Sequence, residues 1–118
     1  MGAALLLVVL SSSSSALTFD PSQMSPSARA YYDCMMSTSA SYAKRSANAD
    51  EAIDAARDAC SKDRLEFIEA TAIETYDQMR AKGLNPDPTV IYNATVEATD
   101  ETDRMTRPHF VRNVLDAK

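Results

Sequence analysis

The sequence predicts an all-α protein: an antiparallel helical hairpin stapled by one disulfide, with a long central helix, a third helix and a short C-terminal helix. The composition is rich in alanine and contains only two glycines and no tryptophan, which favours helix over strand. The chain shows no alternating strand pattern. Cys34 and Cys60 are the only two cysteines and lie equally far from Ala47, where one helix ends and another begins. A hairpin at Ala47 therefore brings the two sulfurs face to face.

The N-terminal segment is typical of an export signal. An apolar run extends from Ala3 to Leu10 and is followed by five serines and Ala16. The run is too short to span a bilayer, which takes roughly 20 residues, but it fits a secretory signal peptide that is cleaved after Ala16. We expect residues 1–16 to be a signal peptide and residues 17–118 to form one small helical domain, secreted or periplasmic. A disordered or buried apolar N-terminus, or a misassigned start, is the alternative, because no Lys or Arg precedes the run.

The two cysteines are expected to form a structural disulfide. Export to an oxidising compartment permits the bond, and two cysteines allow only one intramolecular pairing. Catalytic dithiols usually lie close together in sequence, as in Cys-x-x-Cys, whereas Cys34 and Cys60 fall on separate predicted helices. A redox-active pair and free or intermolecular thiols are the alternatives.

Capping residues predict the first two helices. Ser25 can cap a helix whose first position is a proline, and we expect this helix to cover residues 26–46. Asn48 can cap the second helix. No Gly or Pro follows until Gly83, which predicts one uninterrupted central helix over residues 48–82. Gly83 is the residue type that commonly follows a helix end.

The C-terminal part is predicted to contain two more helices. Asp87 can cap, and Pro88 can begin, a third helix that runs to about Thr106. Pro108 is expected to interrupt it, because proline lacks an N–H and clashes with the preceding turn. A short fourth helix then presents one apolar face, which consists of Phe110, Val111, Val114 and Leu115.

The two hairpins have a predicted register. Folding about Ala47 places Cys34 opposite Cys60. Folding about Asn85 opposes two stripes at helical spacing, one on the central helix and one on the third. In that register Leu65, Ile68, Ala72, Tyr76 and Met79 face Met105, Thr102, Ala98, Ala94 and Ile91, in this order.

The charge balance excludes several classes of function. The net charge is −5 and no large basic cluster occurs, which argues against nucleic-acid binding and against a membrane partner after signal removal. No metal-ligand spacing or nucleotide loop is present, so neither a metal nor a cofactor is expected. The acidic residues of the third helix are interpreted as a solvated face: Glu97, Asp100, Glu101 and Asp103. Asp100 and Asp103 are each expected to pair with the arginine four positions later.

Three single residues are candidate sites. Arg64 shares a helix face with Cys60, and we expect it to pair with an acid such as Asp33 or with a helix terminus. The alternative is that it binds a ligand anion. His109 is the only histidine, and a surface or cap role is expected for it, because nothing around it marks a catalytic site. Asn93 begins an N-glycosylation sequon, which matters only in a eukaryotic protein.

The sequence therefore predicts a small exported helical protein, not an enzyme, that acts by binding another protein or by forming a homodimer. The expected interface lies on the half of the central helix that the first helix cannot cover: Phe67, Ile73, Tyr76 and Met79. An exposed apolar patch there marks an interface. One alternative is a carrier of a small apolar ligand, held between helices and lined by methionine and tyrosine. The other is a hydrolase that uses His109, which requires a cleft with a serine and an acid in reach.

Overall fold

The computed structural model describes residues 21–118, and within this range the chain is built from helices and connecting turns. The α-helices are α2 (Pro26–Tyr42), α3 (Ala49–Ala59), α4 (Ser61–Ala81) and α5 (Pro88–Ala117), and the short 3-10 turns η1 (Pro21–Gln23) and η2 (Ala43–Arg45) flank α2. The prediction of an all-α fold with four helices is confirmed. The expected signal peptide, residues 1–16, and its cleavage site after Ala16 lie outside the described residues.

Capping side chains determine where α2, α3 and α5 begin. Ser25 and Asn48 each accept a hydrogen bond on the side-chain oxygen from the backbone N–H three residues later, at 3.3 and 2.9 Å. Asp87 accepts one from the backbone N–H of Thr89 at 2.9 Å. Each bond satisfies an N–H group that has no acceptor inside its own helix. All three predicted caps are confirmed.

A glycine ends α4. Gly83 has a φ of +82°, in the left-handed region that a residue without a Cβ adopts freely. The Gly83 N–H donates to the Arg80 carbonyl and the Leu84 N–H donates to the Met79 carbonyl, both at 3.0 Å. These two bonds form a Schellman motif, so the predicted role of Gly83 is confirmed.

Two helix boundaries differ from the predicted ones. The predicted central helix is divided into α3 and α4 at Cys60, where φ is −98° and ψ is 14°. Conversely, α5 continues through Pro108, which the sequence predicted to be an interruption. Pro108 removes one backbone hydrogen bond from the helix, but packing holds α5 on both sides. Asp103 is ion-paired to α3 and α4 before the proline, and Phe110 is buried after it.

The disulfide joins α2 to the junction between α3 and α4. The sulfurs of Cys34 and Cys60 are 2.08 Å apart and the Cα atoms are 6.0 Å apart, a separation that is usual for a disulfide. Cys60 is fully buried. The predicted pairing is confirmed, and it coincides with the break between the two helices.

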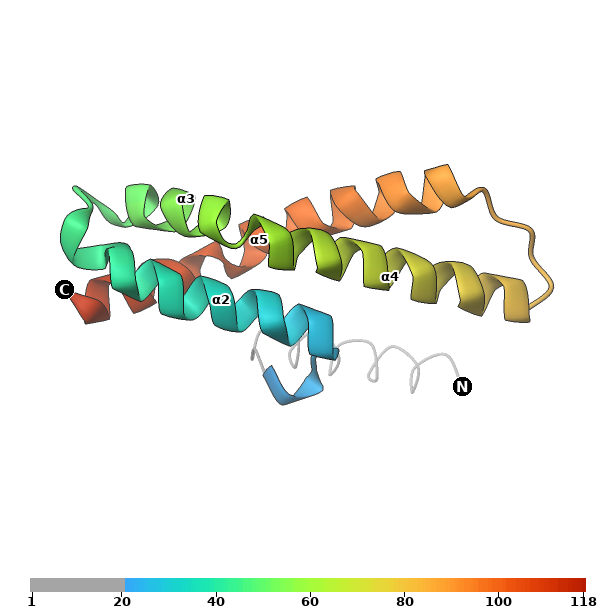
Figure 1. Ribbon diagram of the computed structural model, residues 1–118, viewed down its shortest axis with the longest axis horizontal. Helices are drawn as coiled ribbons and strands as arrows, with labels where there is room; N and C mark the ends of the chain where they lie inside the picture. Colours follow the sequence, from blue (N-terminus) through green and yellow to red (C-terminus); the bar gives the residue numbers. More distant parts are fainter. Residues whose placement is uncertain (1–20) are drawn as a thin grey trace, which may run out of the picture.

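The helices form a bundle from which an arm extends (Figure 1). The helices α2 and α3 and the C-terminal half of α5 pack side by side, whereas most of α4 and residues 88–102 of α5 extend past them as a two-helix hairpin, here called the α4–α5 arm. The radius of gyration is 17.0 Å, against about 13 Å for a compact chain of about 100 residues. The arm explains this elongation and leaves much of its own surface uncovered.

The hydrophobic core lies where α2, α3 and α5 meet. Its buried members are Tyr31, Met35, Ala43, Ala52, Ile53, Ala56, Cys60, Phe110 and Val114. From the predicted apolar face of the C-terminal segment, Phe110 and Val114 enter this core, whereas Leu115 is exposed. Asn113 ties the same segment to α2, because its side-chain amide donates to the Met36 carbonyl at 2.8 Å.

The seam of the α4–α5 arm agrees only partly with the predicted register. Ile68 and Ala72 on α4 and Ile91 on α5 are buried, as expected. Leu65, which was predicted to face Met105, is 47% exposed, and Met105 is exposed as well. The predicted contact between these two side chains is therefore wrong.

On α5 the seam is made by threonines instead of alanines. Thr95 and Thr99 are buried, whereas Ala94 and Ala98, which the predicted register placed in the seam, are exposed. Each threonine hydroxyl donates to the backbone carbonyl four residues earlier, at 2.8 Å. A hydroxyl that is satisfied within its own helix lets the rest of the side chain pack like an apolar one. A prediction from apolar periodicity could not distinguish this face from its neighbour.

Candidate functional site

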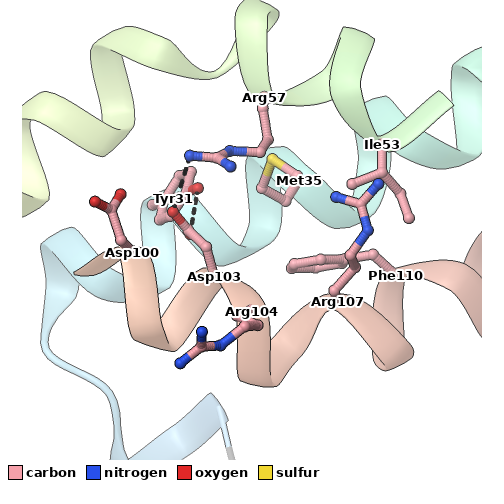
Figure 2. Close-up of a pocket in the computed structure, with 9 residues that line it drawn as sticks. All are labelled: Tyr31, Met35, Ile53, Arg57, Asp100, Asp103, Arg104, Arg107 and Phe110. Atoms are coloured by element: carbon pink, nitrogen blue, oxygen red, sulfur yellow. Dashed lines mark hydrogen bonds and ion pairs between the residues drawn. The ribbon is translucent and has the colours of Figure 1, made fainter. Parts of the chain in front are cut away.

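A pocket opens between α2, α3 and α5 at the edge of the core (Figure 2). This α2–α3–α5 pocket has a volume of about 290 Å³. Its floor receives one buried core side chain from each helix: Met35, Ile53 and Phe110. Figure 2 shows Arg57 on one side of Met35 and Arg107 on the other. The pocket thus has an apolar interior and charged side chains at its opening.

Asp103 is the centre of a polar network that forms one wall of the pocket. Its side chain is 9% exposed. One carboxylate oxygen accepts from the Tyr31 hydroxyl at 2.7 Å. The other is 2.9 Å from Arg64 Nε and 3.1 Å from Arg57 Nη2. A carboxylate this buried is costly unless donors meet its lone pairs, and here α2, α3 and α4 each supply one donor to α5.

The network keeps Tyr31 neutral and Arg64 charged. Burial, and then the hydrogen bond to Asp103, raise the pKa of Tyr31 above its usual value, because a phenolate would be desolvated and would face a carboxylate. Burial lowers the pKa of Arg64, but the hydrogen bond to Asp103 and the charge of that carboxylate outweigh burial and raise it overall. Tyr31 therefore serves as a hydrogen-bond donor and Arg64 as a cation.

Three arginines line the mouth of the pocket: Arg57, Arg104 and Arg107. Arg107 pairs with Asp50 at 2.9 Å and with Asp54 at 3.4 Å, and the hydrogen bond to Asp50 is the main reason why the pKa of Arg107 is raised. Arg104 pairs with Glu101. The three acids are exposed, and exposed ion pairs contribute only about 0–1 kcal/mol. The guanidinium groups of Arg104 and Arg107 are therefore weakly held by their present partners.

The interior of the pocket offers apolar contact. Throughout the described residues, every buried side-chain nitrogen or oxygen has a hydrogen-bond partner. No fully buried polar side-chain atom behind the lining of the pocket is therefore left unpaired. Chemically, the cavity combines an apolar floor with a charged mouth, at which three arginines outnumber the two aspartates of the lining.

Two open apolar grooves run along the α4–α5 arm. One, of about 340 Å³, is lined by Ile73 and Tyr76 of α4 together with Tyr92 of α5. The other, of about 550 Å³, is lined by Phe67 and Met79 of α4. The structure thus divides the four predicted interface residues between two grooves. Ile73 is exposed, whereas Phe67 also packs against the core and stacks on a tyrosine of α2.

The structure gives Arg64 different partners from the predicted one. Its guanidinium contacts Asp103 and Asp100 on α5, and not Asp33, which instead pairs with Arg29 one turn earlier on α2 at 3.7 Å. Both carboxylates engage the guanidinium of Arg64. Arg64 therefore supports Asp100 and Asp103 from α4 and is not itself among the residues that line the α2–α3–α5 pocket.

The predicted ion pairs within the third helix are also wrong. Asp103 pairs with arginines of α3 and α4, and Arg107 crosses to acids of α3. Arg104 pairs with Glu101, three positions earlier. The predicted solvated acidic face is correct for Asp100 and Glu101, which are exposed, and incorrect for Asp103, which turns inward.

The prediction omitted Arg57 and placed Asp103 on a solvated face, although a signal for their pairing was present. Arg57 and Arg64 are two helical turns apart and share a face with Cys60. Two cations on a face that turns toward the core require an acid from another helix. Which acid supplies the charge depends on how α5 is rotated about its axis, and no local pattern encodes that rotation.

His109 lies apart from the pocket. It is exposed on α5 and is not among the residues that line the α2–α3–α5 pocket. Between residues 21 and 118, no group of three or more His, Cys, Asp or Glu side chains is arranged to hold a metal ion. No helix of that range combines the length and the apolar character needed to cross a bilayer.

The α2–α3–α5 pocket and the α4–α5 arm are the two features that carry a functional argument. The first is a cavity with a distinct polar wall, and the second is an uncovered apolar surface. No protein-family model, no curated protein and no solved structure matches this chain.

Proposed function

We propose that the protein acts by binding another protein through the α4–α5 arm, a second copy of itself being the simplest partner, and that it has no catalytic activity. We place it in an oxidising compartment, secreted or periplasmic. The Cys34–Cys60 disulfide supports this location, because such bonds persist where thiols are not kept reduced. The signal-like run from Ala3 to Leu10 supports it independently.

The observation that carries the proposal is the apolar surface of the arm. Ile73 on α4 is 62% exposed and Val90 on α5 is 63% exposed, and both Leu84 and Tyr92 are exposed nearby. The helices α2 and α3 end short of this region (Figure 1). Exposed apolar patches on a protein usually mark an interaction site, and the arm carries exposed apolar side chains in both of its grooves.

A second arm is a suitable partner for this surface. A two-helix hairpin buries only its seam, whereas two hairpins laid together form a four-helix bundle with a shared core. A two-fold axis would bring the same side chains from each copy into contact. The grooves that hold Ile73 and Val90 lie on the two sides of the seam, so either side can meet its equivalent.

Sedimentation velocity over a range of concentrations tests the proposal. The parent should show a concentration-dependent dimer, and either Ile73→Glu or Val90→Glu should weaken it by about tenfold or more, because the interface would bury an unpaired charge. The variant whose dimer is weakened identifies the groove that forms the dimer contact. Leu115→Glu is the matched control, since Leu115 is an exposed apolar residue of α5 outside the arm. A parent that stays monomeric at every concentration would contradict self-association, and equal sensitivity of the control would place the contact elsewhere.

A further inference from the structure

We infer that the α2–α3–α5 pocket binds a small amphipathic carboxylate, with its apolar body on Met35, Ile53 and Phe110 and its carboxylate between the arginines of the mouth. This inference goes beyond the proposed protein-binding function, because the pocket lies at the core of the bundle and not on the arm. The volume of the pocket limits the size of the ligand, its interior limits the polarity of the ligand, and its mouth limits the charge of the ligand.

The cavity limits the size and the polarity of the part of the ligand that enters it. Its volume of about 290 Å³ is just below the usual range for small-molecule sites, about 300–1,000 Å³, so only a small ligand fits. The floor consists of buried apolar side chains from three helices. A polar group placed against this floor would lose its hydration without compensation, because the side chains of Met35, Ile53 and Phe110 offer no strong hydrogen-bond partner. The part of the ligand inside the pocket is therefore apolar.

The mouth sets the sign of the ligand's charge. Both aspartates that line the pocket already have cationic partners: Asp103 accepts from three donors, and Asp100 is paired with Arg64. Arg107 is held by exposed acids on α3, and Arg104 by an exposed acid on its own helix. A ligand carboxylate can replace such a weak partner and accept two parallel hydrogen bonds from one guanidinium.

The position of the arginines favours a ligand that lies across the mouth. Arg57 and Arg107 stand on either side of Met35 in Figure 2, and Arg57 is fixed there by its ion pair with Asp103 at 3.1 Å. A carboxylate above Met35 therefore meets a cation on each side. The whole chain has a net charge of −5, whereas three arginines and two aspartates line this pocket, so cations outnumber acids among its lining side chains.

Methyl-detected NMR of the disulfide-bonded protein, labelled at methionine methyl groups, tests the inference directly. Two carboxylates serve as probes, octanoate with an aliphatic body and 3-phenylpropionate with an aromatic body, and the better of the two identifies the kind of body. Either carboxylate should shift the Met35 methyl signal and give intermolecular NOEs to it. Octanamide, which matches octanoate without its charge, should bind about tenfold more weakly, since bonds between ions exceed neutral ones.

Matched variants separate the pocket from the outer surface of α5. Arg107→Gln should weaken octanoate binding by about tenfold, whereas Arg112→Gln, which removes the same charge from an exposed site outside the pocket, should bind as the parent does. If Arg107→Gln fails to fold, Arg104→Gln takes its place, because the exposed Arg104 pairs only with Glu101 in its present conformation. Equal affinity for octanamide, absence of NOEs to Met35, no binding of either carboxylate, or sensitivity at Arg112 instead of Arg107 would each overturn the inference.

Discussion

At the scale of single residues, Asp103 connects the four α-helices of residues 21–118. It lies on α5 and receives one donor from each of α2, α3 and α4. Its carboxylate therefore links the helices through polar contacts, whereas the disulfide joins α2 to the α3–α4 junction covalently. The same side chain holds Arg57 at the mouth of the pocket, so one residue links stability to the candidate binding site.

Asp103→Asn should destabilise the protein by about 2–4 kcal/mol, because Arg57 and Arg64 lose their charged acceptor in a partly buried site. Arg57 keeps some contact with water, which places the effect below that of a fully buried pair. Glu101→Gln is the control, since Glu101 makes only an exposed pair with Arg104, and it should change stability by about 0.5 kcal/mol or less. Urea denaturation of both variants measures the difference. Equal stability of the two would show that the network contributes nothing.

Tyr31→Phe should make the free energy of unfolding fall less steeply as the pH rises into the alkaline range. The pKa of Tyr31 is raised in the folded protein, by burial and then by the hydrogen bond to Asp103. Above about pH 10, where an unfolded tyrosine ionises, the unfolded state releases a proton that the folded state keeps. This contribution to stability is complete below about pH 10 and is lost as the pH rises from there toward the folded pKa. Urea unfolding at about pH 8, 10 and 11 should show a smaller decrease in the free energy of unfolding for the variant than for the parent. The same dependence on pH in both proteins would exclude a raised pKa of Tyr31.

At the scale of elements, α5 is the helix that both parts of the molecule share. Its first half forms the arm with α4, and its second half completes the bundle with α2 and α3 (Figure 1). Continuity through Pro108 makes this double role possible. A break at that position would uncouple the mouth of the pocket, which includes Arg104 and Arg107, from the buried Phe110.

Ile68 and Leu65 provide a matched test of the arm's seam. Ile68 is 3% exposed and Leu65 is 47% exposed on the same helix. Ile68→Asp should destabilise the protein by about 3–5 kcal/mol, because it buries an unpaired charge, whereas Leu65→Asp should cost less than about 1 kcal/mol. Thermal and urea unfolding of the two variants report the contrast. Comparable losses would restore the predicted register, in which Leu65 also faces the third helix.

At the scale of the whole molecule, the bundle and the arm contain different candidate binding surfaces. The bundle contains the disulfide, the core and the α2–α3–α5 pocket, whereas the arm has little cover beyond its own seam. We therefore expect an arm variant to alter association without changing ligand binding, and a pocket variant to do the reverse. This separation allows the two proposals to fail independently.

Reduction of the disulfide should lower the stability of the whole molecule. The bond joins positions 26 residues apart, and closing a loop of that length contributes about 3–4 kcal/mol on the chain-entropy model. The melting temperature should fall on addition of a reductant, and Cys34→Ser with Cys60→Ser should reproduce the fall. Because α2 packs on both α3 and α4 at this bond, the loss should spread over the core and not stay local. A double variant as stable as the oxidised parent would show that packing alone sets the arrangement.

Much of the fold could be predicted from local signals. The caps at Ser25, Asn48 and Asp87 and the stop at Gly83 act on backbone groups within a few residues, so the sequence alone reveals them. The Cys34–Cys60 pair was also predictable, because only one intramolecular pairing exists. The pocket was not predictable as a site, since its residues come from three helices and share no motif.

By itself, the sequence determined the helical class, the positions where α2, α3 and α5 begin and α4 ends, and the disulfide. Only the tertiary structure decided that α5 continues through Pro108, that threonines form the seam and that Asp103 turns inward. The physical reason is the range of the interactions involved. A helix cap or a helix stop depends on neighbours along the chain. The rotation of a helix about its axis depends on what the other helices bury against it. The same packing decides whether a helix tolerates a proline, which costs about 3 kcal/mol.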